Sequence, residues 1–328
     1  MTSPVTTSEW IYCLNSFRYY NHSGDTRFSP DRTFTFKSYI DAILNSIKIQ
    51  SDTAISVSVP LQHTLCEYYG NKGVTHPIRN YLDHLIKEIS LLSAQVPKRC
   101  TISYLHWNSN VQHLLNDAEM TELMYQLNKK FSLLPQGRGR YVVELDSTLM
   151  HEGTVALLTG LGFSHACLTT PFIESISEKN MLMEQIEMLR SYGFKTISTS
   201  VPGSALANLD ELNEQVTRLI DTKPDTICVP GGEDHRCELH VNKRHSNSHP
   251  ESTLNLLHRQ GYRHSGCCKF SRSDEMLSWH IHDLLALGLS ATSLIDNILI
   301  HNLDQLDQYV QSIDEGQLPF SYGGYLRA

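Results

Sequence analysis

After residue 50 the sequence alternates short runs rich in β-branched and aromatic residues with longer stretches that carry apolar residues three and four positions apart. The short runs predict strands at Ala54–Val59, Thr101–Trp107, Arg140–Leu145, His165–Thr170, Lys195–Val201, Thr226–Pro230 and Tyr262–Phe270. The longer stretches predict helices at Ile78–Ala94, Asp117–Phe131, Met150–Leu161, Glu178–Tyr192, Leu209–Thr222 and Ser252–Gln260. Strict alternation predicts an α/β protein with a parallel sheet, because a crossover must carry the chain back between parallel strands.

About six strand–helix units favour a partial (β/α)6 barrel over a complete eightfold one, with a doubly wound sheet as the alternative. Residues 1–50 are rich in Tyr, Phe, Ser, Thr and Arg, and predict an irregular N-terminal arm leading into one helix, Phe36–Ile47. We therefore expect an arm and helix at 1–50 and a barrel with a C-terminal extension at 51–328. Ligands of parallel barrels bind at the carboxyl ends of the strands, so Gln62–Lys72 and Asn108–Gln112 should share one rim.

The composition excludes several classes of partner. The chain has 328 residues, a formal net charge of −8 and a pI of about 6.1, which does not favour nucleic acid. No apolar run is long enough to span a membrane, and Met1–Glu9 lacks the charged-then-apolar pattern of a signal peptide. Eight scattered cysteines without a Cys-x-x-Cys pair predict free thiols. We therefore expect a cytoplasmic protein with neither a nucleic-acid nor a membrane partner.

The most specific pattern in the chain is carried by short segments in a fixed order, namely Tyr20–Arg27, Val59–Thr75, Leu105–Trp107, Val143–Asp146 and Leu284–Ile295. Their order and spacing resemble the oxygen-independent coproporphyrinogen III oxidases, which are radical S-adenosylmethionine (SAM) enzymes of haem biosynthesis. The resemblance runs from about residue 10 to residue 325 and implies a partial barrel of the radical SAM type. It also leads us to expect that the additional C-terminal helical domain of the family is missing.

The resemblance implies a cluster-binding loop after the first strand. The family reads Cys-x3-Cys-x2-Cys there and holds a [4Fe–4S] cluster by three thiolates. In this chain the outer positions are Gln62 and Tyr69, and only Cys66 remains. An amide and a phenol are poor ligands for such iron. Cys66 is therefore expected to be a residual metal-ligand position, unless His63 or His76 supplies unusual ligation.

The resemblance also implies that the SAM site is altered. Asn108–Gln112 stands where the family reads Gly-Gly-Gly-Thr-Pro, whose glycines let the backbone approach SAM closely. Ser56 and Ser58 replace a tyrosine and a histidine of the family, and further cofactor contacts fall on His165, Pro171 and Thr199 or Ser200. Glu144 is the residual SAM-site position, although an ordinary strand-end hydrogen bond would also account for a carboxylate there. We expect no catalytic residue and no cofactor; the alternative is a [4Fe–4S] cluster with SAM.

The resemblance also implies a substrate cavity, because the family binds a tetraanionic tetrapyrrole. Such a ligand requires cationic side chains around a large apolar pocket. Arg27 and Arg272 keep family-like positions and are the substrate-binding candidates, and Lys72 follows the former cluster loop. Each of the three could instead be an ordinary solvated or structural basic residue.

Seventeen histidines are many for this length. Several gather in one polar segment or close to it, namely His235, His240, His245, His249, His280 and His282. Their spacing does not match a helical metal pair, so the segment predicts a solvated, pH-sensitive loop. Ligation of haem iron or of a divalent metal is the alternative.

Three hypotheses for the function follow. The first is a catalytically inactive relative of the family that keeps the scaffold to bind a porphyrin, haem or a protein partner. The second is an active coproporphyrinogen III dehydrogenase with unusual cluster ligation, which would convert two propionates to vinyl groups by oxidative decarboxylation. The third is a structural or regulatory partner of an active paralogue. The sequence alone does not separate the first from the third.

Overall fold

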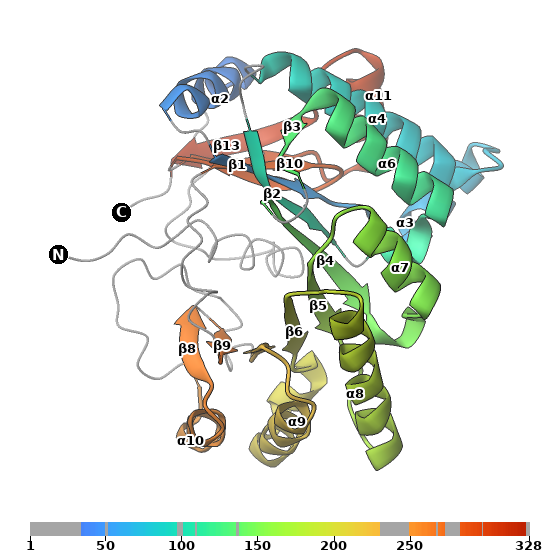
Figure 1. Cartoon of the computed structure of the whole chain (residues 1–328). Coiled ribbons are helices and arrows are strands. Elements are labelled where there is room, and N and C mark those ends of the chain that lie inside the picture. The colour runs from blue at the N-terminus through green and yellow to red at the C-terminus, as the bar shows by residue number, and fades with distance from the viewer. Residues whose placement is uncertain are drawn as a thin grey trace. The chain divides into compact units, whose positions relative to one another are not determined.

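The computed structural model describes residues 34–49, 52–96, 101–108, 110–135, 138–229, 249–266, 268–272, 283–296 and 298–325. The chain divides into two compact units. The middle unit comprises the described residues between Val142 and His280, and the N/C unit those from His22 to Tyr141 and from Ile281 to Ala328. Each unit contains strands covered by helices (Figure 1).

The sheet of the N/C unit has the strand order β13-β12-β11-β10-β1-β2, with β3 beside β2. Strands β10, β1 and β2 run parallel, whereas β10, β11, β12 and β13 follow one another antiparallel. The strands are β1 (Asp52–Val57), β2 (Thr101–Trp107), β3 (Ser132–Leu133), β10 (Asp283–Leu287), β11 (Thr292–Ile295), β12 (Ile298–Asn302) and β13 (Phe320–Tyr325).

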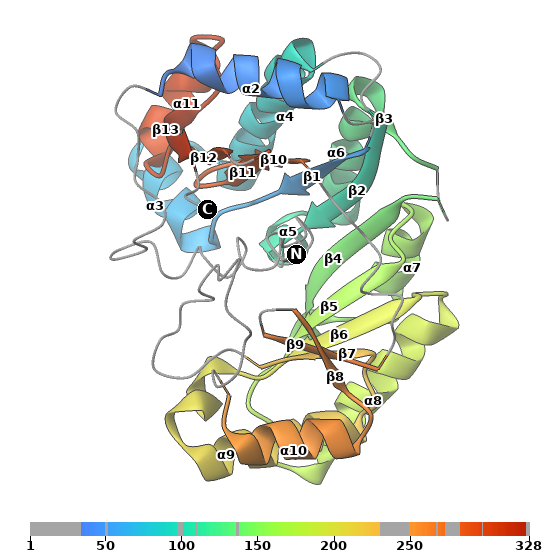
Figure 2. The same cartoon turned by 90° about the vertical axis from the view of Figure 1, so that its left-hand side faces the viewer.

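The helices of the N/C unit are α2 (Phe36–Ile49), α3 (Gln62–Asn71), α4 (Pro77–Gln95), α5 (Asn110–Leu114), α6 (Asp117–Lys130) and α11 (Leu306–Asp314). Helix α4 buries Leu82, Leu85, Ile89 and Leu92, as its apolar periodicity predicted, and it also buries Glu88, which no apolar pattern predicts. Helix α6 lies beside α4 in both views (Figures 1 and 2). It begins at a capping box in which Asn116 and Glu119 bond each other's backbone N–H.

The middle unit has the strand order β4-β5-β6-β7-β9-β8, in which β4 to β7 are parallel and β7, β9 and β8 are antiparallel. Its strands are β4 (Arg140–Asp146), β5 (His165–Thr169), β6 (Thr196–Ser200), β7 (Thr226–Cys228), β8 (Arg263–Gly266) and β9 (Lys269–Ser271). Its helical elements are η1 (Ser147–Leu149), α7 (Glu152–Gly160), α8 (Ile176–Ser191), η2 (Gly203–Ala207), α9 (Leu209–Asp221) and α10 (Glu251–Arg259).

Register gives the strands of the middle unit one mostly apolar and one polar row of side chains, because side chains alternate along each strand. One row across the strands is Leu145, Leu168, Thr199, Ile227 and Phe270. The adjacent row, which points to the other face, is Glu144, Cys167, Ser198, Thr226 and Ser271. The polar row is itself buried, since Cys167, Ser198, Thr226 and Ser271 are all largely shielded from solvent.

These elements confirm the prediction of an α/β protein with parallel strands. Two local expectations were wrong. The single strand predicted at Tyr262–Phe270 is the antiparallel pair β8 and β9, because a turn at Cys268 reverses the chain. The expected loop at Gln62–Lys72 is mostly the helix α3, which buries Leu65 and Tyr69 at a spacing of four residues. Among the described helices, none has the length and apolar character that crossing a membrane requires.

Candidate functional site

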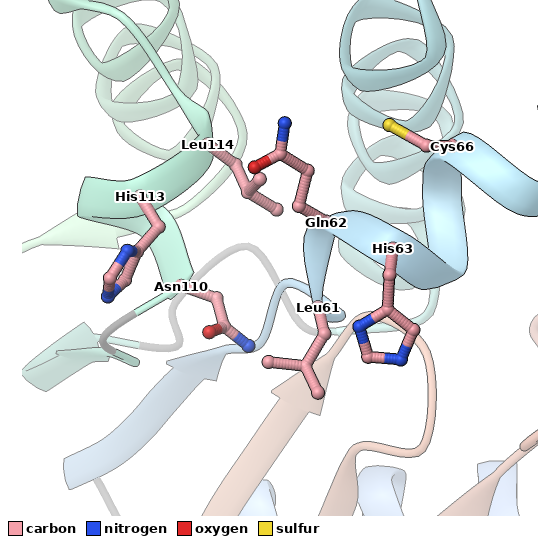
Figure 3. Close-up of a pocket in the computed structure, with 7 residues that line it drawn as sticks. All are labelled: Leu61, Gln62, His63, Cys66, Asn110, His113 and Leu114. Carbon is pink, nitrogen blue, oxygen red and sulfur yellow. The ribbon is translucent and has the colours of Figure 1, made fainter.

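A pocket of about 520 Å³ lies where the chain leaves strands β1 and β2. Its walls come from the start of α3 and from α5, and Figure 3 shows the side chains that line it. The lining residues are Leu61, Gln62, His63, Cys66, Asn110, His113 and Leu114. The pocket thus stands at the rim that the sequence indicated, and its wall carries no charged side chain unless an imidazole is protonated.

Of the three positions that would hold a cluster in the family, the structure brings Gln62 and Cys66 to this pocket and not Tyr69. Cys66 is an exposed free thiol, and its side chain and that of Gln62 point to the same side of α3 (Figure 3). Tyr69 is buried, with its hydroxyl 3.5 Å from Nδ1 of His84, and burial raises the pKa of that hydroxyl. A neutral phenol turned into the core does not complete a ligand set around Cys66.

Asn108 ties the end of β2 to the loop that follows β1. The side chain is buried, its Oδ1 accepts a hydrogen bond from the N–H of Val59 at 3.2 Å, and its Nδ2 donates to the carbonyl oxygen of Val59 at 3.1 Å. Nδ2 also lies 3.3 Å from Oγ of Ser58. Asn110 adds a further bond from its Nδ2 to the same Val59 carbonyl, at 2.8 Å. We call this arrangement of Asn108, Asn110, Ser58 and Val59 the amide clamp.

The amide clamp fills the segment in which the resemblance implied a glycine turn. A glycine backbone leaves room for another molecule, whereas here two side-chain amides satisfy the groups of the neighbouring loop. Further down the same strands, Oγ of Ser56 lies 3.2 Å from Nδ1 of His106, and both residues are buried. The polar groups at the ends of β1 and β2 therefore hydrogen-bond to one another.

Two imidazoles line the pocket. His63 was a sequence candidate for unusual ligation, and it lies on α3 with its ring turned to a different side from Cys66 (Figure 3). His76, the other such candidate, is exposed at the start of α4 and does not line the pocket. Sequence reasoning missed His113 on α5. Its position shortly after the end of β2 was the available signal, because such positions lie at a ligand-binding rim.

The remaining sequence candidates lie outside this pocket. Glu144 is half-buried on β4 of the middle unit, in register with Cys167. Arg272 belongs to the same unit; its guanidinium stacks 4.4 Å from the ring centre of Tyr262, and its side chain is exposed. Arg27 lies outside the described residues. Neither Glu144 nor Arg272 is among the residues that line the pocket.

Of the histidine-rich segment, the described structure includes only His249. Its Nε2 donates to the carbonyl oxygen of Val229 at 2.7 Å, and its ring packs edge-on against Phe270 with centroids 5.3 Å apart. His249 is therefore a buried core histidine, so the expectation of a solvated loop was wrong at this position. Within the described ranges, no three His, Cys, Asp or Glu side chains are placed to hold a metal ion.

Comparison with known proteins found relatives and no matching family model. The chain is 25% identical over 325 residues to the oxygen-independent coproporphyrinogen III oxidase of Pseudomonas aeruginosa, covering 87% of this chain and 70% of that protein. The protein of the same name from Escherichia coli K12 is 24% identical over 356 residues, covering 95% of this chain and 77% of the relative.

A solved structure shares the fold. It is that of the coproporphyrinogen III oxidase of Escherichia coli, described as a radical SAM enzyme; the match has a TM-score of 0.71, 21% sequence identity, and covers 95% of this chain and 80% of that one. This likeness confirms the predicted fold class. Together with the two relatives, it confirms the family resemblance that the motifs indicated.

Proposed function

Because this chain is a relative of the oxygen-independent coproporphyrinogen III oxidases, we propose that it keeps their fold without their radical chemistry and uses the pocket beside Cys66 to bind a tetrapyrrole. The amide clamp is the observation that carries this proposal. The side-chain amides of Asn108 and Asn110 hydrogen-bond to Ser58 and Val59. They occupy the place where a SAM-binding turn would need an accessible backbone.

The donor set supports the same proposal. A cluster of the family type needs three thiolates, which are soft and charged ligands. The pocket offers the thiol of Cys66 together with the amide of Gln62, and Tyr69 is turned into the core. These residues do not fit a [4Fe–4S] cluster.

The pocket has the volume of a small-molecule site. Its volume of about 520 Å³ falls within the range of roughly 300–1,000 Å³ that is usual for small-molecule sites. Leu61 and Leu114 offer apolar contact, and a neutral imidazole such as that of His63 is a common axial ligand of haem iron. Arg27 and Arg272 stay candidates from the sequence for pairing with propionates, and Arg272 is not among the residues that line this pocket. A cytoplasmic location, where thiols stay reduced, is part of the proposal.

Titration with haemin, coproporphyrin III and coproporphyrinogen III tests ligand binding. We expect at least one of them to bind, and we expect His63→Ala to abolish the haemin-induced absorption band. His76→Ala is the matched control, because it removes an imidazole that is near in sequence but does not line the pocket. Failure of all three compounds to bind the wild-type protein would overturn the tetrapyrrole proposal.

Anaerobic reconstitution with iron and sulfide tests the loss of radical chemistry. We expect iron at background level and no cleavage of SAM under reducing conditions. About four irons per chain with a broad absorption near 400 nm would contradict the proposal and favour the active dehydrogenase instead.

A further inference from the structure

Glu88 is a buried carboxyl group in the interior of the N/C unit. It lies on α4 and is 1% exposed. Its Oε2 accepts hydrogen bonds from the hydroxyl of Tyr309 at 2.6 Å and from the N–H of Gly288 at 2.9 Å, and its Oε1 accepts from Nδ2 of Asn302 at 3.0 Å. All three partners are uncharged, and no Lys or Arg of the described ranges pairs with this carboxyl.

A continuous set of hydrogen bonds joins Glu88 to the entrance of the pocket. The turn after β10 receives two of them, because Gly288 donates to Glu88 and the N–H of Leu289 donates to the Tyr81 hydroxyl at 2.9 Å. That hydroxyl lies 3.2 Å from the carbonyl oxygen of Ser58, and the Tyr81 ring stacks on the ring of Tyr309 with centroids 5.7 Å apart. Ser58 belongs to the amide clamp, so it holds the loop that leads to the pocket wall.

The turn also touches the loop directly. The N–H of Ser58 donates to the carbonyl oxygen of Leu287 at 2.9 Å. Gly288 has a φ of +106°, and a Cβ built there would lie 2.0 Å from the carbonyl oxygen of Ser58. Only glycine permits this approach. The turn at Gly288 and the backbone of Ser58 are therefore in direct contact.

We propose that Glu88 couples the protonation state of this interior to the pocket entrance: the neutral carboxyl keeps the Gly288–Leu289 turn and Ser58 in place, and ionisation loosens them. A neutral carboxyl can donate its proton to Tyr309 and still accept from Asn302. An ionised one is a buried charge without a cation, which is costly unless water reaches it. The inference concerns the ligand-free protein and does not depend on what the pocket binds.

Glu88 is the group near the turn that changes charge around neutral pH. Burial raises its pKa to about 7, against the lowering effect of its three donors. Tyr39 from α2, Tyr81 from α4 and Tyr309 from α11 are the other titratable groups around it; burial and the charge of Glu88 raise the pKa of both Tyr39 and Tyr309, which keeps them neutral. His84, one turn earlier on α4, contacts Asp314 at 3.4 Å instead.

The sign of the effect follows from the raised pKa. An open state in which water reaches Glu88 has an ordinary carboxyl pKa, so it binds the proton more weakly than the closed state. Opening is therefore favoured as pH rises from the ordinary value toward about 7, and it levels off above that pH. The neutral form holds the turn closed, and the ionised form opens it.

Hydrogen–deuterium exchange of peptides covering Ser58 and the Gly288–Leu289 turn tests the proposal, after correction for the intrinsic pH dependence of exchange. We expect corrected exchange to rise by at least about tenfold between about pH 5 and about pH 7, and then to level off. In Glu88→Gln the corrected exchange should be independent of pH between these limits, because the amide cannot ionise. Glu122→Gln, which removes an α6 carboxyl paired with Arg79, is the control and should behave like the wild type.

Tyr309→Phe tests the same coupling without removing the carboxyl. It deletes one donor to the ionised form, so the pKa of Glu88 should rise and exchange should level off at a higher pH than in the wild type. His84→Gln removes the α4 imidazole that contacts Asp314, and should leave the profile unchanged. Flat exchange in the wild type, an unchanged profile in Glu88→Gln, or an unmoved plateau in Tyr309→Phe would each overturn the proposal.

Discussion

The side-chain amide of Asn108 pairs with both backbone groups of Val59, accepting from its N–H and donating to its carbonyl oxygen across 49 positions of sequence. Both residues are buried, so these groups have no water to replace a lost partner. This pair fixes how the loop after β1 meets the end of β2, and it places Leu61 and Gln62 at the pocket wall.

Asn108→Ala should therefore lower the free energy of unfolding by about 1–3 kcal/mol, the usual effect of leaving a buried polar group unpaired. Asn110→Ala is the control, because it removes a single bond to a carbonyl that Asn108 still serves. Urea unfolding of the two variants should show the larger loss for Asn108. Equal, small losses would mean that the amide clamp does not hold the loop.

The stability of the whole protein should depend on the ionisation of Glu88. Its pKa is raised from 4.5 to about 7 in the folded state, so its contribution is complete below the unfolded value and is lost as pH rises through about 7. The shift corresponds to about 3 kcal/mol across that window. The difference in unfolding free energy between Glu88→Gln and the wild type should therefore change across this pH window and be constant outside it. A difference that stays constant across the whole pH range would refute this dependence on Glu88.

Gly288→Ala should be severely destabilising. The new Cβ would overlap the Ser58 carbonyl oxygen, and φ of +106° is unfavourable for any other residue. The backbone effect alone is worth about 1–3 kcal/mol. Gly316→Ala measures this backbone effect without a steric clash, because Gly316 has a φ of +75° and no atom lies within 4 Å of the new Cβ. Thermal unfolding should show a clearly greater loss of stability for Gly288→Ala than for Gly316→Ala. Similar losses of stability would mean that the turn is not in close contact with Ser58.

The thiols should differ in reactivity. Cys66 is exposed, whereas Cys228 is buried and has its pKa raised by a hydrogen bond with Cys268 and by burial. Only the thiolate reacts, so alkylation of the native protein should modify Cys66 much faster than Cys228 or Cys268. Peptide mapping by mass spectrometry after short exposure to iodoacetamide measures this, and unfolded protein, in which all three should react, is the control. Comparable labelling in the native state would contradict the assignment of Cys66 to an open wall.

Sequence patterns predicted those elements in which local periodicity and burial agree. The strand Thr101–Trp107 has the same bounds in the structure, and α4 exceeds its predicted range by one residue at each end. The predicted strand Tyr262–Phe270 is divided by a turn at Cys268, and Gly266 inside it was the available sign of an interruption. The helical conformation of Gln62–Asn71 was missed for a similar reason, since the motif suggested a loop while the spacing of Leu65 and Tyr69 is helical.

The position of the candidate site could be predicted from the sequence, whereas the side-chain hydrogen bonds around it could not. The rim followed from the rule that ligands bind at the carboxyl ends of parallel strands, and Cys66 and Gln62 lie there. The partnership of Asn108 with Val59 and that of Glu88 with Gly288 join residues far apart in sequence. Side-chain pairings over such distances depend on tertiary packing, which no local pattern records.

The amide clamp has a consequence for protein engineering. Placing cysteines at Gln62 and Tyr69 would leave Asn108 and Asn110 bonded to Val59. Replacing Asn108 by glycine would remove the partner of the Val59 N–H and one of the two amides that serve its carbonyl oxygen. A variant designed to carry the glycine turn of the relatives would therefore need new partners for Val59 in the same design, because no single substitution supplies both.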